Sequence, residues 1–159
     1  MPGGCTGRVS GGQAMIVARR ERQVEWGDCD PARIVFNPRF FEWFDAQTAL
    51  IFETAGLPKR DLLRRLDFAG IPLVETRARF HQPVRFGDIV AIESRIVAVR
   101  KSSFDVEHRL TNGSELATEG FETRVWTMRD PNDPERIKSY RIPPDILAKL
   151  GIEVRSRAP

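Results

Sequence analysis

Apolar and polar positions follow a helical period in one long segment of the chain. Asn37-Pro38 is typical of a helix start, with Asn at the N-cap and Pro in the first turn. Gly56, followed by Pro58, predicts that the helix stops at about Ala55. A helix on a flat surface needs an apolar stripe of only about 100°, whereas the apolar arc here spans roughly 200°. We therefore expect a curved surface around this helix. The residues of the arc are Phe40, Phe41, Trp43, Phe44, Leu50, Ile51, Phe52 and Ala55.

A period of two, typical of β-strands, holds on both sides of this helix. The predicted strands cover residues 16–26, 71–82, 89–99, 104–111 and 115–128. Asn112-Gly113 predicts a type I′ hairpin between the last two. A short amphipathic helix, two surface loops and a terminal turn or helix are expected at 57–66, 83–88, 130–135 and 143–150. With the last four strands in an antiparallel meander, this order predicts an α+β hotdog fold, a curved antiparallel sheet wrapped around one long central helix.

Length and composition fit one globular domain. The chain has 159 residues, of which 41% are hydrophobic and 30% charged. The Gly-rich residues 1–14 are expected to be a disordered leader, which leaves 15–159 as a single domain and Met15 as a possible start. No window reaches the ~18 apolar residues of a membrane span, and no signal-peptide profile is present. We expect a cytoplasmic protein with no membrane partner.

Charge and cysteine content narrow the classes of function. The net charge is +3 and the isoelectric point about 9.2, but the basic residues are scattered and no nucleic-acid module is recognisable. The two cysteines, Cys5 and Cys29, lack both a disulfide framework and metal-site spacing. Flanking carboxylates disfavour a reactive thiolate at Cys29. We expect a structural Cys29, no metal and no nucleic-acid partner.

The run Asp28-Cys29-Asp30 carries the strongest chemical signal. A strand ends in two carboxylates, a short turn follows, and a helix begins about seven residues after Asp30. A carboxylate near unpaired N–H donors of a helix start can attack or deprotonate while the donors hold a developing oxyanion, which suits acyl transfer. The competing interpretation is ordinary turn chemistry, because Asp favours turns and precedes Pro comfortably. A calcium loop is excluded by Arg33 and Arg39 at its sixth and twelfth positions.

The segment from Trp26 to Asp45, which reads WGDCDPARIVFNPRFFEWFD, resembles the signature of the 4-hydroxybenzoyl-CoA thioesterase branch of the hotdog-fold thioesterases. The resemblance implies thioester hydrolysis with Asp30 as the catalytic carboxylate, acting as nucleophile or as general base on water, and with Asp28 in a structural role. It implies that the backbone N–H near Asn37 holds the thioester oxygen. The chain departs from the family pattern at Arg33, where Gly is usual, and at Asn37, where close relatives carry an aromatic residue.

The same resemblance implies where the substrate binds. Arg100 and Lys101 match a basic run that contacts coenzyme A phosphates, with Ser102 in place of the third basic residue; the alternative is a solvated hairpin turn. Lys138 is a weaker candidate for that role. Asp45 aligns with an acid that recognises a phenolic group; the alternative is an ordinary carboxylate at the helix edge. Coenzyme A is then part of the substrate rather than a separate cofactor. The family further implies a homodimer or a homotetramer built as a dimer of dimers, which would cover exposed edge strands.

Alternatives remain open within this framework. The substrate is an aromatic acyl-CoA, a short or branched aliphatic acyl-CoA, or an acyl carrier protein thioester. A non-catalytic acyl-CoA-binding protein of the same fold is a different class, and the carboxylate of Asp30 beside a helix start argues against it. His81 and His108 are lone histidines without a readable triad, so both are expected to be structural.

Overall fold

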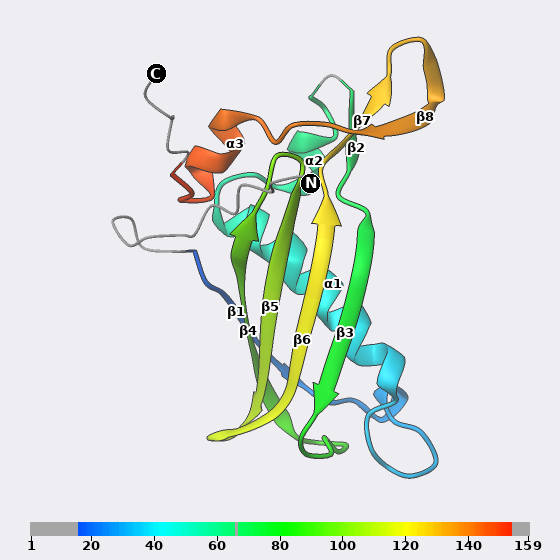
Figure 1. Cartoon of the computed structure of the whole chain (residues 1–159). Helices are drawn as coiled ribbons and strands as arrows, with labels where there is room; N and C mark the ends of the chain where they lie inside the picture. Colours follow the sequence, from blue (N-terminus) through cyan, green and yellow to red (C-terminus); the bar gives the residue numbers. More distant parts are fainter. Residues whose placement is uncertain (1–15, 66, 154–159) are drawn as a thin grey trace, which may run out of the picture.

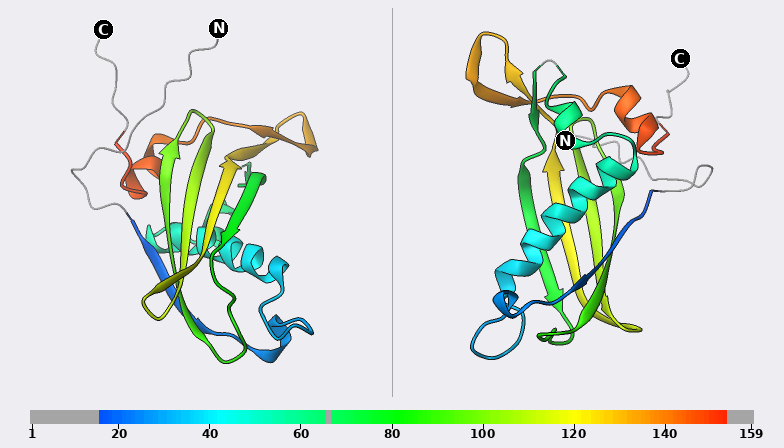
Figure 2. Two further views of the ribbon diagram at one scale, coloured as in Figure 1. Left: turned by 60° about the horizontal axis from the view of Figure 1, so that its bottom comes forward. Right: turned by 180° about the vertical axis from the view of Figure 1, so that it is seen from behind.

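One five-stranded antiparallel sheet curls around the long helix α1 (Asn37–Thr54) and forms the body of the molecule (Figure 1). The computed structural model describes residues 16–65 and 67–153, so the predicted leader and Met15 lie outside it. The strands of the sheet are β1 (Ala18–Gln23), β3 (Leu73–Phe80), β4 (Ile89–Val99), β5 (Ser103–Asn112) and β6 (Glu115–Val125). Figure 2 shows α1 lying across the concave side of this sheet. The predicted α+β architecture is confirmed.

Helix α1 has the expected end but a different start. The prediction that Asn37 is the N-cap is wrong: Phe36 occupies that position in an extended conformation, without a side-chain cap. Phe36 stays extended because its N–H donates to the carbonyl of Asp28 at 2.9 Å, which pairs it across a hairpin. At the other end, Gly56 adopts φ 75. The N–H groups of Gly56 and Leu57 donate to the carbonyls of Glu53 and Phe52, which is a Schellman cap.

The strand order corrects the predicted meander. Strands β4, β5 and β6 do follow one another as expected, but the order β1-β4-β5-β6-β3 places β3 beside β6, at the far edge. Period-two alternation specifies faces and carries no information on partners, which explains the error. The hairpin between β5 and β6 forms where predicted, with Asn112 paired to Glu115. Positive φ occurs at Gly113 and not at Asn112 or Ser114, a type II′ pattern instead of type I′.

A small second sheet replaces several predicted features. The expected strand over 115–128 is interrupted at Trp126, which lies just beyond the end of β6; its N–H still donates to the carbonyl of Ser102 at 2.8 Å. The chain continues as β7 (Thr127–Asp130), which pairs with β2 (Phe68–Gly70) and β8 (Asp133–Ser139). The predicted loop over 130–135 is therefore mostly strand. The residues of β8 are all exposed, so no apolar alternation signals this strand. The remaining helices are short: α2 (Lys59–Leu62), inside the predicted 57–66, and α3 (Pro144–Lys149).

The core lies between α1 and the sheet in two apolar clusters. One gathers around Phe44, Val90 and Leu110, the other around Ile51, Phe104 and Trp126. Phe44 approaches the sheet so closely that a Cβ at Gly120 would lie 2.4 Å from its ring. Gln47 and Thr48, on the same helix face, are buried polar residues. The apolar arc predicted for α1 is thus real but is interrupted where the helix crosses the middle of the sheet.

Strand β3 is an exposed edge. Of its eight residues only Ala78 is half-buried, and the rest are exposed. Val74 is 65% exposed although its position in the alternation is apolar. The sheet therefore ends in an uncovered strand on the side of β6.

Candidate active site

Asp30 sits at the tip of a tight hairpin directly before α1. A short 3₁₀ turn (Trp26–Asp28) leads into it, and Cys29 pairs with Val35 as an antiparallel bridge. The N–H of Asp30 donates to the carbonyl of Ile34 at 3.0 Å. Its carboxylate accepts the N–H of Ala32 at 2.8 Å through Oδ1, an Asx turn. The half-buried carboxylate is thereby fixed through one oxygen.

Arg33 completes this turn in a conformation that favours glycine. Its φ is 64, and its N–H donates to the carbonyl of Asp30 at 2.8 Å. A left-handed conformation is costly for a residue with a Cβ. The departure from the usual Gly at Arg33 thus leaves the turn formed, at the cost of local backbone strain.

The start of α1 contributes an unpaired backbone donor. Within the described part of the chain, the N–H of Asn37 donates to no acceptor, whereas those of Phe36 and Arg39 are both bonded. Pro38 has no N–H. Because Phe36 pairs with the carbonyl of Asp28, the hairpin holds the Asp30 turn and this helix terminus on one short structure. The carboxylate of Asp30 and an unpaired backbone N–H thus come from the same local unit, and an N–H of this kind can stabilise an oxyanion.

The neighbours of Asp30 have structural roles, as expected. Asp28 is 8% exposed and accepts the N–H of Glu25 at 2.9 Å, with Arg22 and Arg39 at 3.7 and 3.9 Å. Desolvation, Asp28 and Asp30 together raise the pKa of the Cys29 thiol above its usual range. This direction disfavours a thiolate at Cys29.

Asp45 belongs to a charged cluster that the sequence analysis missed. Its Oδ1 accepts a hydrogen bond from Arg124 Nη2 at 2.7 Å, and Arg124 also donates to Glu122. Desolvation would raise the pKa of Glu122, but His108, at 3.5 Å, and Arg124 outweigh it and lower that pKa to about 2. Glu122 and Arg124 occupy alternate positions of an ordinary strand pattern, Glu-Thr-Arg. The sequence did contain a signal for this cluster, namely two charged residues at positions of a core strand that face inward.

In the basic turn between β4 and β5, one of the two cations predicted to bind phosphate is already paired with a carboxylate. Arg100 is bound by both oxygens of Asp105, at 2.9 and 2.6 Å, and this pairing lowers the pKa of Asp105. Lys101 is exposed and makes no ion pair among the described residues. The carbonyls of Lys101 and Ser102 accept the N–H groups of Ile142 and Trp126 at 2.9 and 2.8 Å, which fixes the turn.

Lys138 lies in the adjoining small sheet. It pairs with Asp130 at 2.5 Å, and this contact lowers the pKa of Asp130 below its usual range. Lys138 and Arg100 are therefore both neutralised within the chain. Of the predicted cationic contacts, Lys101 alone is uncommitted in the part that the structure describes.

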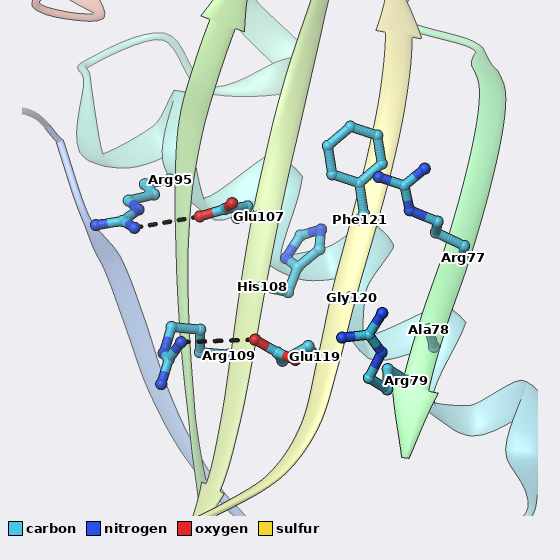
Figure 3. A pocket seen from close by; sticks show the side chains of 10 residues that line it. All are labelled: Arg77, Ala78, Arg79, Arg95, Glu107, His108, Arg109, Glu119, Gly120 and Phe121. Atoms are coloured by element: carbon cyan, nitrogen blue, oxygen red, sulfur yellow. Dashed lines mark hydrogen bonds and ion pairs between the residues drawn. The ribbon is translucent and has the colours of Figure 1, made fainter. Parts of the chain in front are cut away.

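A shallow hollow of about 470 Å³ lies on the outer face of the sheet, away from α1 (Figure 3). Its charges largely satisfy one another: Arg95 pairs with Glu107 at 3.2 Å and Arg109 with Glu119 at 3.7 Å. Arg77 stacks 4.0 Å above the Phe121 ring. None of the predicted site residues lines this hollow. It is not the predicted active site.

Two further observations concern other kinds of site. Among residues 16–65 and 67–153, no group of His, Cys, Asp and Glu is arranged to hold a metal ion. None of the helices in this range is both long and apolar enough to cross a membrane.

Comparison with known proteins identifies the family and agrees with the fold. Residues 24–150 match the Thioesterase-like superfamily. The chain is 34% identical over 133 residues to 4-hydroxybenzoyl-CoA thioesterase from Pseudomonas sp. (strain CBS-3), covering 80% of this chain and 92% of that protein. The chain belongs to the 4-hydroxybenzoyl-CoA thioesterase family.

Solved structures of thioesterases share the hotdog fold with this family member. A 4-hydroxybenzoyl-CoA thioesterase mutant in complex with 4-hydroxybenzoyl-CoA superposes with a TM-score of 0.76 at 30% identity, covering 85% of this chain and 99% of that one. A gentisyl-coenzyme A thioesterase superposes with a TM-score of 0.71 at 28% identity, covering 80% and 98%. The protein is accordingly an enzyme, an acyl-CoA thioesterase of the hotdog fold.

Proposed function

We propose that this thioesterase hydrolyses a hydroxylated aromatic acyl-CoA with Asp30 as its catalytic carboxylate. The observation that carries the proposal is the hairpin that joins the Asp30 turn to the unpaired N–H of Asn37 at the start of α1. The acyl groups named for two relatives, 4-hydroxybenzoyl and gentisyl, are both ring-hydroxylated benzoyl groups. This shared chemistry supports an aromatic substrate with a ring hydroxyl.

Asp30 acts in one of two ways on the thioester carbonyl carbon. As a nucleophile, its carboxylate forms a mixed anhydride and expels coenzyme A as the thiolate; water then cleaves the anhydride and regenerates Asp30. As a general base, it takes a proton from water while the water oxygen attacks the same carbon; the C–S bond then breaks, and the departing thiolate of coenzyme A receives the proton from Asp30. In either route the carbonyl oxygen gains negative charge and accepts the N–H of Asn37.

Binding of the two ends of the substrate is assigned to different elements. Asp45, whose side chain is 67% exposed, accepts the ring hydroxyl. Lys101, with Ser102 beside it, contacts the phosphates of coenzyme A. Arg100 and Lys138 are paired with Asp105 and Asp130, so they stabilise the protein around the phosphate site and contribute at most secondary contacts to the phosphates. No cofactor is required, because coenzyme A enters and leaves as part of the substrate and product.

We further propose a homodimer that forms through β3 and pairs further into a tetramer. Strand β3 offers an unpaired backbone edge and the apolar side chains Leu73, Val74 and Phe80, each at least 45% exposed. A second copy of the chain placed there would cover this edge. It would also close the side of the helix on which Asp45 lies, because Asp45 bonds to Arg124 on the strand next to β3.

Substitution of Asp30 tests the proposed chemistry. Asp30→Asn keeps the Asx turn, because an amide oxygen also accepts the Ala32 N–H, but removes the charge. We expect kcat on hydroxybenzoyl-CoA to fall roughly 10²–10⁴-fold, with an unchanged thermal midpoint. Release of free thiol, followed continuously, measures the rate.

Asp28→Asn is the matched control. It should lower the thermal midpoint, because Arg22 loses its carboxylate partner and Arg39 keeps only Glu42, while kcat changes less than in Asp30→Asn. Full activity in folded Asp30→Asn would reject the catalytic assignment. A wild-type preference for butyryl-CoA over both benzoyl esters would reject the aromatic substrate and retain the thioesterase.

A further inference from the structure

Two oppositely charged side chains are buried on the face of the sheet that packs against α1. Glu122 is 1% exposed and Arg124 6%, and both face α1 from alternate positions of β6. A buried ion pair is often no more stabilising than apolar residues of the same volume. Core packing alone therefore does not explain why these two residues are charged.

Glu122 is anchored from the helix and from two strands. Thr48 on α1 donates to its Oε2 at 2.7 Å, and Arg124 Nε donates to the same oxygen at 2.8 Å. His108 Nε2 lies 3.5 Å away on β5, and its Nδ1 is held by Ser94 on β4 at 2.7 Å. The carboxylate of Glu122 thus has one orientation, set by three elements.

Arg124 links the fixed carboxylate of Glu122 to Asp45 on the surface of α1. Its Nη2 bonds both Glu122, at 3.0 Å, and Asp45, at 2.7 Å, while Nη1 donates to the carbonyl of Ile71 at 3.2 Å. A planar guanidinium held at Nε, Nη1 and Nη2 cannot turn without losing a bond. In the described part of the chain, Asp45 Oδ2 has no hydrogen-bond partner. Since the side chain is 67% exposed, that oxygen is accessible to a ligand.

We propose that Arg124, held by Glu122, is a positioning residue that fixes Asp45 so that its second carboxylate oxygen accepts the ring hydroxyl of the acyl group. This inference rests on the proposed function, since it concerns the same substrate. An ionised carboxylate only accepts hydrogen bonds. The arrangement therefore selects a ring substituent that donates, and it disfavours an unsubstituted ring or a ring carboxylate.

The readout is the hydroxyl preference, defined as kcat/KM for 4-hydroxybenzoyl-CoA divided by kcat/KM for benzoyl-CoA. Arg124→Lys keeps the charge but cannot hold Glu122 and Asp45 together. We expect it to lower the hydroxyl preference roughly tenfold, the lower end for a hydrogen bond to a charged group. Asp45→Ala should lower it at least as much. In the double variant the preference should fall no further than in Asp45→Ala alone, because both changes remove one interaction.

Arg95→Lys is the matched control. Arg95 pairs with Glu107 on the outer face of the same sheet, so the same substitution there should leave the hydroxyl preference unchanged. If Arg124→Lys does not fold, Glu122→Gln provides the second variant: it keeps the shape of the anchor, weakens its hold on Arg124, and should lower the preference in the same direction.

The outcomes separate this inference from the proposed function. An unchanged hydroxyl preference in folded Arg124→Lys or Glu122→Gln, with a lowered preference in Asp45→Ala, overturns the positioning role and leaves the substrate assignment intact. A wild-type enzyme with no hydroxyl preference overturns the substrate assignment and this inference with it.

Discussion

At the scale of single residues, the acidic side chains differ in what their oxygens already bind. Both oxygens of Asp105 accept hydrogen bonds, from Arg100 and Thr123, and the buried Asp28 accepts a backbone N–H and lies 3.7 and 3.9 Å from two arginines. Asp30 and Asp45 each have one oxygen engaged and the other free within the described residues. The same comparison separates the cations: Arg100 and Lys138 are paired, and Lys101 is not. We therefore choose the candidates for chemistry by their unused hydrogen-bond acceptors and unpaired charges more than by residue type.

Lys101 is therefore the residue on which to test coenzyme A binding. Lys101→Ala should raise KM for a CoA ester roughly two- to fivefold, the size of an exposed ion pair. The pantetheine ester of the same acid lacks the nucleotide phosphates, so its KM should change little. The effect should shrink as salt is added, because exposed charges are screened.

Lys59→Ala, on the short helix α2, is the control for loss of a surface charge. Equal losses on the CoA and pantetheine esters would contradict a phosphate contact. Arg100→Ala should behave differently, with a lower thermal midpoint, because it leaves the buried Asp105 without its partner.

At the scale of elements, the packing of α1 on the sheet depends on close approach. Phe44 stacks on His108 with ring centroids 4.6 Å apart, and Gly120 makes room for its edge. Gln47 and Thr48 then bring hydrogen bonds into the same interface, to the Ile92 carbonyl at 2.7 Å and to Glu122. These contacts fix the distance between α1 and the sheet. That distance places its first turn beside the Asp30 hairpin.

Gly120→Ala tests this close approach. The added Cβ would lie 2.4 Å from the Phe44 ring, so the helix or the ring must move. We expect a loss of about 1–3 kcal/mol in the free energy of unfolding, the usual cost of overpacking, measured by urea denaturation. Phe44→Leu in the same background should recover part of it. Gly27→Ala, which meets nothing within 4 Å, should have no such effect. A neutral Gly120→Ala would show that the interface is loosely packed.

At the scale of the whole molecule, the free edge of the sheet and Asp45, the candidate contact for the acyl ring, lie on the same side. Strand β3 is uncovered, and Arg124, on its neighbour β6, reaches Asp45. The other edge strand, β1, has no comparable apolar exposure among its own residues, which are mostly charged. Association through β3 would therefore bury apolar surface and border the acyl site at once.

A charge on that edge should disrupt the proposed dimer. Val74→Arg places a cation at a position that is 65% exposed in the single chain. We expect it to lower the molar mass found by light scattering toward that of one chain, 18.1 kDa, and to reduce kcat/KM together with it. Val17→Arg, next to the opposite edge strand, is the matched control. An unchanged mass in folded Val74→Arg would place the interface elsewhere.

The hydrophobic pattern by itself specified the long helix, its end at Gly56, and a sheet curved enough to cover a wide apolar arc. These features follow from local periodicity and capping, which act within a few residues. The Asp30 turn and the helix start were visible for the same reason. The N-cap was misplaced because the bond between Phe36 and Asp28 crosses a hairpin.

Only the tertiary structure decided which strands pair and which charges remain free. The place of β3 beside β6, the division of the last long strand at Trp126, and the strand β8 all depend on partners distant in sequence. Arg100 and Asp105 lie close in sequence, yet they pair only because the chain turns back after β4 and lays β5 beside it. Asp45, Glu122 and Arg124 meet because α1 crosses the sheet at that point. Local sequence sets conformation and the face of each residue, whereas contacts between side chains depend on how the elements pack.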